Sequence, residues 1–238
     1  MPPIAIPAGY PRIRVVHSFA ALLATPFDGD CNAVCWERDL AGDFDAVVAA
    51  LGPCEGVEPI EEDRLATLSV GAAGRLAIET MREDLRLLRD HGHAPVLERV
   101  QAYPRDADDD AAGLPTDVYS FHVDSATVPT DTFLCSYTPP ASRGLRNDEA
   151  RRRVDVPELR ARLLARYGGD DDAGFATFLH EQFHELHYLP VPQAQAWDFG
   201  VGNLWRIAVQ FPGALVPACI HSAPRELPGR GPRLLLIS

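Results

Sequence analysis

The chain has 238 residues, of which 46% are hydrophobic and 24% are charged, and its formal net charge is −12. This length allows one large domain or two small ones, with a core that needs no disulfide or structural metal. No run approaches the roughly 18 apolar residues of a membrane span, so we expect no membrane partner. The acidic balance also argues against nucleic acid as a partner, because phosphate binding requires a cationic face.

The choice of basic residues narrows the chemistry further. All 22 basic residues are arginine, and lysine is absent. Schiff-base chemistry, pyridoxal phosphate attachment and a P-loop lysine are therefore excluded. The five cysteines are scattered and include no Cys-x-x-Cys pair, which is typical neither of a disulfide framework nor of a zinc ribbon. We expect a cytoplasmic protein whose thiols stay reduced.

Residues 1–95 are expected to be mainly helical. Ser18 and Asp43 each precede an apolar stretch in the position of a helix N-cap. The clearest helix spans residues 74–90, where apolar residues recur at helical spacing and Gly92 follows as a stop signal. The apolar residues of this helix are Leu76, Met81, Leu85 and Leu88.

The rest of the chain alternates between strand patterns and helix patterns. Helices are expected at about 147–167 and 173–187, and a run of aspartates between Arg105 and Gly113 indicates a solvated loop. Strands are expected over residues 31–36, 96–103, 118–123, 133–137, 204–211, 217–221 and 233–237.

This order of elements predicts an α+β fold, with an antiparallel β core and helices packed outside it. We expect a single domain over residues 1–238. Its β core starts near residue 96 and is interrupted by a helical insertion at about 147–187.

His122 and Asp124 form the sharpest candidate site. The segment 118–124 alternates like a half-buried strand, so residues two apart point to the same face. One imidazole and one carboxylate on one face supply two ligands of a facial triad, which holds Fe(II) and leaves positions open for oxygen and cosubstrate. The third ligand must be a second histidine, and His221 stands in a late predicted strand. Arg233 opens the last strand, where its guanidinium can hold a carboxylate through two hydrogen bonds.

This pattern of His-x-Asp, a distal His and an Arg about a dozen residues later resembles the Fe(II)- and 2-oxoglutarate-dependent oxygenases of double-stranded β-helix fold. The resemblance implies that His122, Asp124 and His221 bind iron and that Arg233 holds the far carboxylate of 2-oxoglutarate. It also implies a distorted double-stranded β-helix, or jelly-roll, core. The surrounding segments, with a weaker echo at 31–40, also look like an uncharacterised bacterial family of this fold, and that likeness brings no known reaction with it.

Other assignments of these residues stay open at this point. Arg206 and Arg225 are rival partners for the carboxylate, because an alternating strand can point Arg206 into a barrel. An ordinary ion pair is the other interpretation of Arg206. His122 and Asp124 can also form a purely structural pair, with His221 as a core histidine whose hydrogen bonds are satisfied.

A second histidine group lies at residues 180–187. His180-Glu181-x-x-His184 matches the pattern that, on a helix, turns two histidines to one face for zinc, with the glutamate as general base. His187 falls on the same stripe of the helix, at the flank or far side of its apolar face. This stripe can be a polar helix face, a pocket wall beside the iron site, or an independent zinc site.

The favoured interpretation is an enzyme, a non-haem Fe(II)-dependent dioxygenase-like oxidoreductase that uses 2-oxoglutarate and O₂ to oxidise a small molecule. One alternative is a zinc-dependent hydrolase built on His180, Glu181 and His184. The other alternative is a non-catalytic β-helix module that binds a metal or a ligand. The substrate and the oligomeric state are left open by the sequence.

Overall fold

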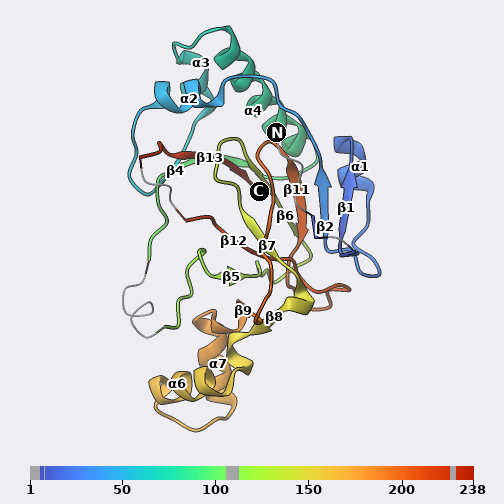
Figure 1. Cartoon of the computed structure of the whole chain (residues 1–238), viewed down its shortest axis with the longest axis vertical. Helices are drawn as coiled ribbons and strands as arrows, with labels where there is room; N and C mark the ends of the chain where they lie inside the picture. Colours follow the sequence, from blue (N-terminus) through green and yellow to red (C-terminus); the bar gives the residue numbers. More distant parts are fainter. Residues whose placement is uncertain (1–5, 8, 106–112, 226–228) are drawn as a thin grey trace.

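The structure is a computed structural model that describes residues 6–7, 9–105, 113–225 and 229–238 (Figure 1). Along its longest axis lie helices at one end, β-sheets in the middle and a small helical unit at the other end. The acidic run expected between residues 105 and 113 falls mostly outside the described residues. Within the described parts of the chain, no helix has the length and apolar character needed to cross a membrane.

The first helices begin at the caps that the sequence predicts. α1 (Phe19–Ala24) follows Ser18, and α2 (Phe44–Leu51) follows Asp43; each cap side chain accepts a hydrogen bond from a backbone amide three residues later. α4 (Ala72–Asp90) ends at the predicted position. These agreements reflect local chemistry, since a cap and an apolar stripe are both visible within a few residues.

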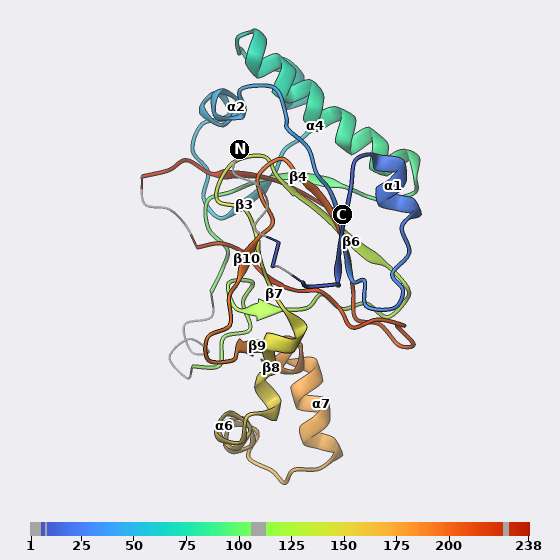
Figure 2. The same ribbon diagram turned by 45° about the vertical axis from the view of Figure 1, so that its right-hand side comes forward.

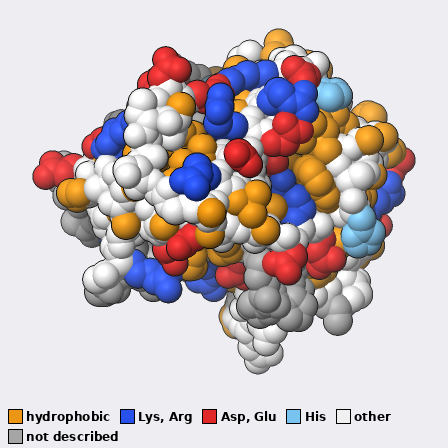
Figure 3. Space-filling view, turned by 90° about the horizontal axis from the view of Figure 1, so that it is seen from above, with side chains coloured by type: hydrophobic (Ala, Val, Ile, Leu, Met, Phe, Trp, Pro, Cys, Tyr) orange, Lys and Arg blue, Asp and Glu red, His pale blue; other side chains and the backbone are white. Residues whose placement is uncertain are grey.

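α4 has one buried apolar stripe and one charged outer stripe. On the outer stripe Arg86 pairs with Glu83, and Arg89 pairs with Glu62 of α3 (Glu62–Thr67). Figure 3, which looks down on this end of the molecule, shows acidic and basic side chains interspersed rather than a field of one sign. The buried stripe consists of Ala77, Ile78, Met81, Leu85 and Leu88, together with the charged Asp84.

The strands of the described residues form two sheets, and the mixed α and β composition agrees with the predicted class. The larger sheet has seven strands in the order β1-β2-β11-β6-β13-β4-β3, and the smaller has six in the order β10-β7-β12-β5-β9-β8. The larger sheet contains β1 (Ile13–Val16), β2 (Ala33–Trp36), β3 (Val57–Pro59), β4 (Val96–Val100), β6 (Asp131–Ser136), β11 (Leu204–Ala208) and β13 (Arg233–Ile237). The smaller sheet contains β5 (Phe121–His122), β7 (Arg143–Leu145), β8 (Ala150–Arg152), β9 (His187–Pro190), β10 (Trp197–Asp198) and β12 (Ile220–Ser222).

Eight of these strands form nested antiparallel pairs. β4 pairs with β13, β5 with β12, β6 with β11, and β7 with β10. The first strand of this series therefore meets the last, and the two middle strands meet each other. Two segments that are far apart in the sequence, near residues 122 and 221, become direct neighbours for this reason.

The larger sheet separates two apolar clusters. On its helix side, Leu204 of β11 and Leu234 and Leu236 of β13 pack with α1, α2 and α4. On its other side, Trp205 of β11 packs against Trp197 of β10, so the two sheets face each other across this cluster. Alternate residues of a strand point to opposite faces, which fixes where the arginines of β11 and β13 point.

The chain between β7 and β10 adds β8, β9 and the helical unit that projects below the sheets (Figure 2). The helix predicted at about 147–167 is too long. Its first part forms 3-10 turns at Asn147–Glu149 and Arg153–Asp155 on either side of β8. The helix itself, α6, spans Pro157–Tyr167 and begins at a proline, whose fixed φ suits the first helical turn.

The helix predicted at about 173–187 is also too long. α7 spans only Ala173–Glu181, because Phe183 takes a left-handed conformation with φ 60° and ends the helix. A 3-10 turn, η3 (His184–Leu186), and then β9 follow. Aromatic residues rarely adopt this conformation, so nothing in the sequence pattern signals the break.

A strand is present at each predicted position, but most of these strands differ in length from the prediction. Where a strand over 118–123 is predicted, only β5 pairs, because Asp117 begins a turn and its Oδ1 accepts the amides of Tyr119 and Ser120. β13 has the predicted bounds. β1, β3, β7, β8, β9 and β10 are not predicted from the sequence. Of these, β1 pairs in parallel with β2 at one edge of the larger sheet.

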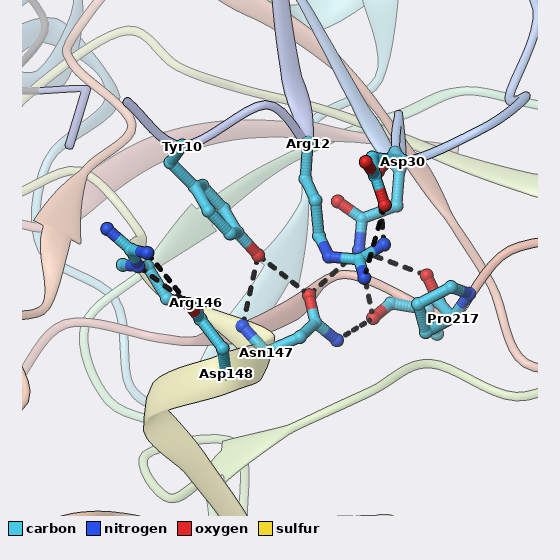
Figure 4. Close-up of polar contacts among 9 residues, drawn as sticks. Tyr10, Arg12, Asp30, Arg146, Asn147, Asp148 and Pro217 are labelled. Carbon is cyan, nitrogen blue, oxygen red and sulfur yellow. Dashed lines mark hydrogen bonds and ion pairs between the residues drawn. The ribbon is translucent and has the colours of Figure 1, made fainter. Parts of the chain in front are cut away.

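A buried polar cluster ties the start of the chain to the segment before β12 (Figure 4). Asn147 Oδ1 accepts hydrogen bonds from the Tyr10 hydroxyl and from Asn32 Nδ2, each at 2.9 Å. Asn147 Nδ2 donates to the Ala218 carbonyl at 3.0 Å, and Asn32 Nδ2 donates to the Pro217 carbonyl at 3.0 Å. The cluster thereby fixes the backbone that leads into β12.

Replacing Asn147→Ala is expected to lower the free energy of unfolding by about 1–3 kcal/mol, because the buried Tyr10 hydroxyl loses its acceptor. Urea denaturation with an unchanged m value measures this loss. Tyr10→Phe is the matched variant, since it removes the same hydrogen bond from the other side. The double variant should cost less than the sum of the two singles; strictly additive losses would contradict the coupling.

Candidate metal centre

His122, Asp124 and His221 come together on the face of the smaller sheet that is turned toward the larger one. Each offers one ligand atom, and these three atoms lie within 4.8 Å of one another. The Nε2 atoms of His122 and His221 lie 3.9 and 3.7 Å from Asp124 Oδ1. Among the residues that the structure describes, this is the one group of three or more His, Cys, Asp or Glu side chains arranged to hold a metal.

The strand register brings the two histidines side by side. His122 of β5 lies directly opposite His221 of β12, and directly opposed residues of paired strands point to the same face. Their ring centroids are 4.5 Å apart. On its other side His221 is opposite Gly144 of β7, where a Cβ atom would lie 2.1 Å from the ring of Trp197. Glycine at this position leaves room for the tryptophan beside the centre.

Asp124 follows β5 and is held through both its backbone and its side chain. Its carbonyl accepts a hydrogen bond from the Gln210 amide at 2.8 Å. Its Oδ2 accepts one from Thr132 Oγ1 of β6 at 2.6 Å, which leaves Oδ1 turned toward the two imidazoles. This role of Thr132 is not predicted from the sequence, because no local pattern connects Thr132 with the His-x-Asp segment.

Hydrogen bonds to backbone carbonyls orient both imidazoles. His122 Nδ1 donates to the Ser120 carbonyl at 2.8 Å, and His221 Nδ1 donates to the Cys219 carbonyl at 3.3 Å. With Nδ1 protonated, a neutral imidazole presents the lone pair of Nε2, the atom that lies near the carboxylate in both residues. Carbonyl partners of this kind fix the tautomer and the ring orientation of histidine ligands. The donor set therefore fits a divalent metal ion.

The protonation states of His122 and Asp124 also favour metal binding. Burial, followed by the nearby charge of His221, lowers the pKa of His122 to about 4. Burial alone would raise the pKa of Asp124, but His221 and the Thr132 hydrogen bond outweigh it and hold the pKa below its ordinary value. At neutral pH His122 is therefore uncharged and Asp124 ionised, which are the forms that bind metal.

A third histidine extends the row across the smaller sheet. His187 of β9 lies opposite His122, with the ring centroids 5.7 Å apart. It is buried, and its Nδ1 is hydrogen-bonded with Ser120 Oγ, on the residue whose carbonyl orients His122. The pairing of β9 with β5 thus makes His187 a neighbour of the candidate ligands, a role that its spacing from other histidines cannot reveal.

The pattern His180-Glu181-x-x-His184 does not build a second ligand cluster with His187. The three histidines lie on a helix, a 3-10 turn and a strand, because α7 ends at Glu181. The side chain of His180 is 76% exposed and its Nδ1 lies 2.7 Å from Glu185 Oε1, whereas His184 is buried. The expected stripe on one helix is therefore corrected by the left-handed turn that interrupts it.

Two of the three candidate arginines share a cleft at the start of β13. Arg233 and Arg225 line this cleft together with Arg230, which the sequence analysis does not single out. Arg233 is only 5% exposed, and its guanidinium donates to the Tyr103 hydroxyl at 3.0 Å. Within the described part of the chain it makes no ion pair. Its charge lowers the pKa of nearby Glu98, but burial outweighs this effect and holds that pKa above its ordinary value. A buried guanidinium with neutral partners suits an anion.

Arg206 points to the opposite face of the larger sheet, which corrects the expectation that it turns into a barrel. It alternates with Trp205, which faces the smaller sheet. Its guanidinium pairs with Asp131 at 2.7 Å and donates to the carbonyls of Leu23 and Thr25 at 2.9 Å each. Arg206 therefore caps the end of α1, in agreement with the interpretation as an ordinary ion pair.

Comparison of the chain with protein-family models, curated proteins and solved structures found no match. What the centre can do therefore rests on its geometry. Three ligands gathered on one side of a metal leave positions for exchangeable ligands. Two histidines and one carboxylate are found both in non-haem Fe(II) oxygenases and in some catalytic zinc sites.

The lowered pKa of His122 predicts acid sensitivity of the metal-free protein. The unfolded chain takes up a proton near pH 6.5, whereas the folded chain does so near pH 4, so stability is present above pH 6.5 and lost as the pH falls toward 4. The pKa difference corresponds to roughly 3 kcal/mol at pH 4. Urea titrations at several pH values should show this slope in the parent protein and a smaller one in His122→Gln. Equal slopes in both proteins would contradict the assignment.

Replacing Thr132→Val removes the hydrogen bond to Asp124 while keeping the side-chain volume. Because Thr132 orients a ligand without supplying one, metal affinity should fall about 10- to 100-fold with the stoichiometry unchanged. Competition with a coloured chelator measures this affinity. Thr127→Val, a threonine on the loop that precedes β6, is the control and should bind metal like the parent.

Proposed function

We propose that the protein is a non-haem Fe(II)-dependent oxygenase that uses 2-oxoglutarate and O₂ to oxidise a small molecule. The observation that carries the proposal is the convergence of His122 Nε2, His221 Nε2 and Asp124 Oδ1, each oriented by a hydrogen bond of its own residue. Bound there, iron would supply the activation of O₂ that couples 2-oxoglutarate decarboxylation to substrate oxidation. The chain's part is to fix the ligands, hold the cosubstrate and exclude water.

The strand connectivity supports this proposal. Nested pairing of β4–β13, β5–β12, β6–β11 and β7–β10, divided between two facing sheets, supports the assignment of the core as a double-stranded β-helix. In this interpretation β1, β2 and β3 extend the larger sheet, and β8 and β9 extend the smaller one. The candidate ligands then lie on β5, just after it, and on β12, as the resemblance of the sequence to these oxygenases implies.

The arginine cleft supports the choice of 2-oxoglutarate. Arg233 alternates with Leu234, which faces the helices, so Arg233 points toward the smaller sheet and the metal side. Thr132, beside Asp124, and Thr138, which accepts from the Leu234 amide, are six residues apart, or roughly 20 Å of strand. The dicarboxylate and the Arg233 side chain would have to bridge this interval, and Arg233 donates to the Tyr103 hydroxyl at the β13 end of it. Arg225 and Arg230 would complete the anion site.

A zinc-dependent hydrolase at His180, Glu181 and His184 finds less support. His180 is exposed and paired with Glu185, and His184 is buried in the packing of the helical unit. A non-catalytic module would keep the fold and the metal without turning over 2-oxoglutarate. Both alternatives make predictions that differ from those of an oxygenase.

The test is anaerobic titration of Fe(II) into metal-free protein, followed by 2-oxoglutarate, with visible absorption as the readout. One equivalent of iron should bind, and a weak charge-transfer band should appear only after 2-oxoglutarate is added. His122→Ala should abolish both effects. His180→Ala, an exposed histidine outside the centre, is the matched control and should leave both unchanged.

A second variant tests the arginine assignment separately. Arg233→Leu should bind iron like the parent but require at least tenfold more 2-oxoglutarate for the same band, because the buried carboxylate partner is lost. Tight zinc binding that is lost in His180→Ala would contradict the oxygenase proposal and favour the zinc-dependent hydrolase. Iron binding without any effect of 2-oxoglutarate would favour the non-catalytic module.

A further inference from the structure

An open groove of about 540 Å³ lies where the chain leaves β5, at the side of the molecule that carries η3. Its lining is mostly apolar and includes Ala126, Phe183, Leu186, Phe211 and Pro212. The volume falls in the range of sites that bind small molecules. Phe183, Glu185 and Leu186 of the histidine-rich segment contribute to one wall of this groove.

The groove is joined to the backbone that holds the candidate ligands. Its lining residue Ser125 directly follows Asp124, and the Gln210 amide donates to the Asp124 carbonyl at 2.8 Å. The carbonyl of Leu186, another lining residue, accepts from the Val123 amide at 3.1 Å. The lining residues Ser125, Gln210 and Leu186 are therefore each bonded to the backbone of Asp124 or of the residue before it. The groove is thus built on the backbone that carries Asp124, although none of its described lining residues is one of the three candidate ligands.

Phe183 gives the groove an unusual aromatic side chain. It occupies the position after the end of α7 where glycine is preferred, with φ 60°. An aromatic residue is disfavoured there, yet its side chain remains 56% exposed at the groove instead of packing into the core. The two loops that form the facing wall also carry the exposed residues Val128 and Leu215. Phe183 itself offers an exposed aromatic surface to the groove.

The charge of the groove differs from that of the arginine cleft. None of the described lining residues is arginine, although the chain has 22 arginines. The charged lining residues are His180 and Glu185, which pair with each other at 2.7 Å. An anionic ligand thus finds no cation of its own in the groove, whereas the cleft at the start of β13 has three guanidinium groups. The remaining polar groups, from Ser125, Thr127 and Gln210, suit neutral hydrogen-bonding partners.

We propose that this groove binds the substrate and that the substrate presents an uncharged, apolar body, aromatic or aliphatic, which packs against Phe183. The assignment of this ligand as the substrate rests on the proposed oxygenase function. The expected preference for an apolar, uncharged ligand follows from the lining of the groove alone. Burial of an aromatic face against such a body supplies binding without charge. The arginine cleft remains for the dicarboxylate.

The test compares two fluorescent probes that share one aromatic framework. N-phenyl-1-naphthylamine is uncharged, and 1-anilinonaphthalene-8-sulfonate adds a sulfonate to it. The uncharged probe should bind one equivalent to the full-length protein, at least tenfold more tightly than the sulfonate. Phe183→Gly should weaken the uncharged probe at least tenfold while the fold is kept, since glycine adopts a positive φ without strain. Leu76→Ala, at an exposed apolar residue of α4, is the control and should bind like the parent.

Proximity to the metal is measured on the same complex with Mn(II) as the metal. Proton resonances of the bound uncharged probe should broaden strongly in the parent protein and not in His122→Ala. If Phe183→Gly binds the uncharged probe as tightly as the parent does, or if the parent binds the sulfonate more tightly, the groove is not the site of an apolar ligand. If the protein binds Mn(II) but the probe resonances do not broaden, the groove is not the substrate site. If the protein binds no metal but Phe183-dependent binding of the probe persists, the oxygenase function and the substrate assignment both fail, and the groove stands as a ligand site.

Discussion

The candidate centre depends on one strand pairing, that of β5 with β12. The side chains of a strand alternate between its two faces, so a shift of one residue would turn either His122 or His221 away from the other. β5 is only two residues long, and its register is fixed by what surrounds it: β9 on its other edge, the Gln210 amide on Asp124, and the polar cluster of Asn147 before β12. Elements far from the centre thus keep its ligands together.

Two hollows near the candidate centre differ in chemistry. The arginine cleft lies at the start of β13 and the apolar groove lies after β5, and among the described residues neither is lined by one of the three candidate ligands. The cleft has buried positive charge and suits a carboxylate, whereas the groove has a balanced ion pair and exposed aromatic surface. In the proposed function, a cosubstrate and a substrate of different charge would bind in different hollows, which would limit competition between them.

The sequence predicts what depends on neighbouring residues and misses what depends on distant ones. The caps at Ser18 and Asp43 and the bounds of β13 follow from local chemistry, and the structure has them as predicted. The grouping of His122, Asp124 and His221 is also predicted. The two-residue spacing suggests that His122 and Asp124 share a face, and the need for a second histidine from a late strand singles out His221. That they hold iron remains a proposal.

The errors have physical causes of the same kind. The helix expected to reach residue 187 stops at a left-handed Phe183, a conformation that an aromatic residue seldom adopts. His187 then belongs to β9 and joins the row of the candidate centre, which only the pairing of distant strands decides. Arg206 turns away from the smaller sheet because the carbonyls at the end of α1 hold it, and those carbonyls lie far from it in the sequence.

The most direct measurement for the whole account is anomalous diffraction from crystals grown with Mn(II) in place of Fe(II). We expect one strong peak from a metal ion that would be held by Nε2 of His122, Nε2 of His221 and the carboxylate of Asp124. No peak at these three residues, or a peak held by His180 and His184 instead, would contradict it.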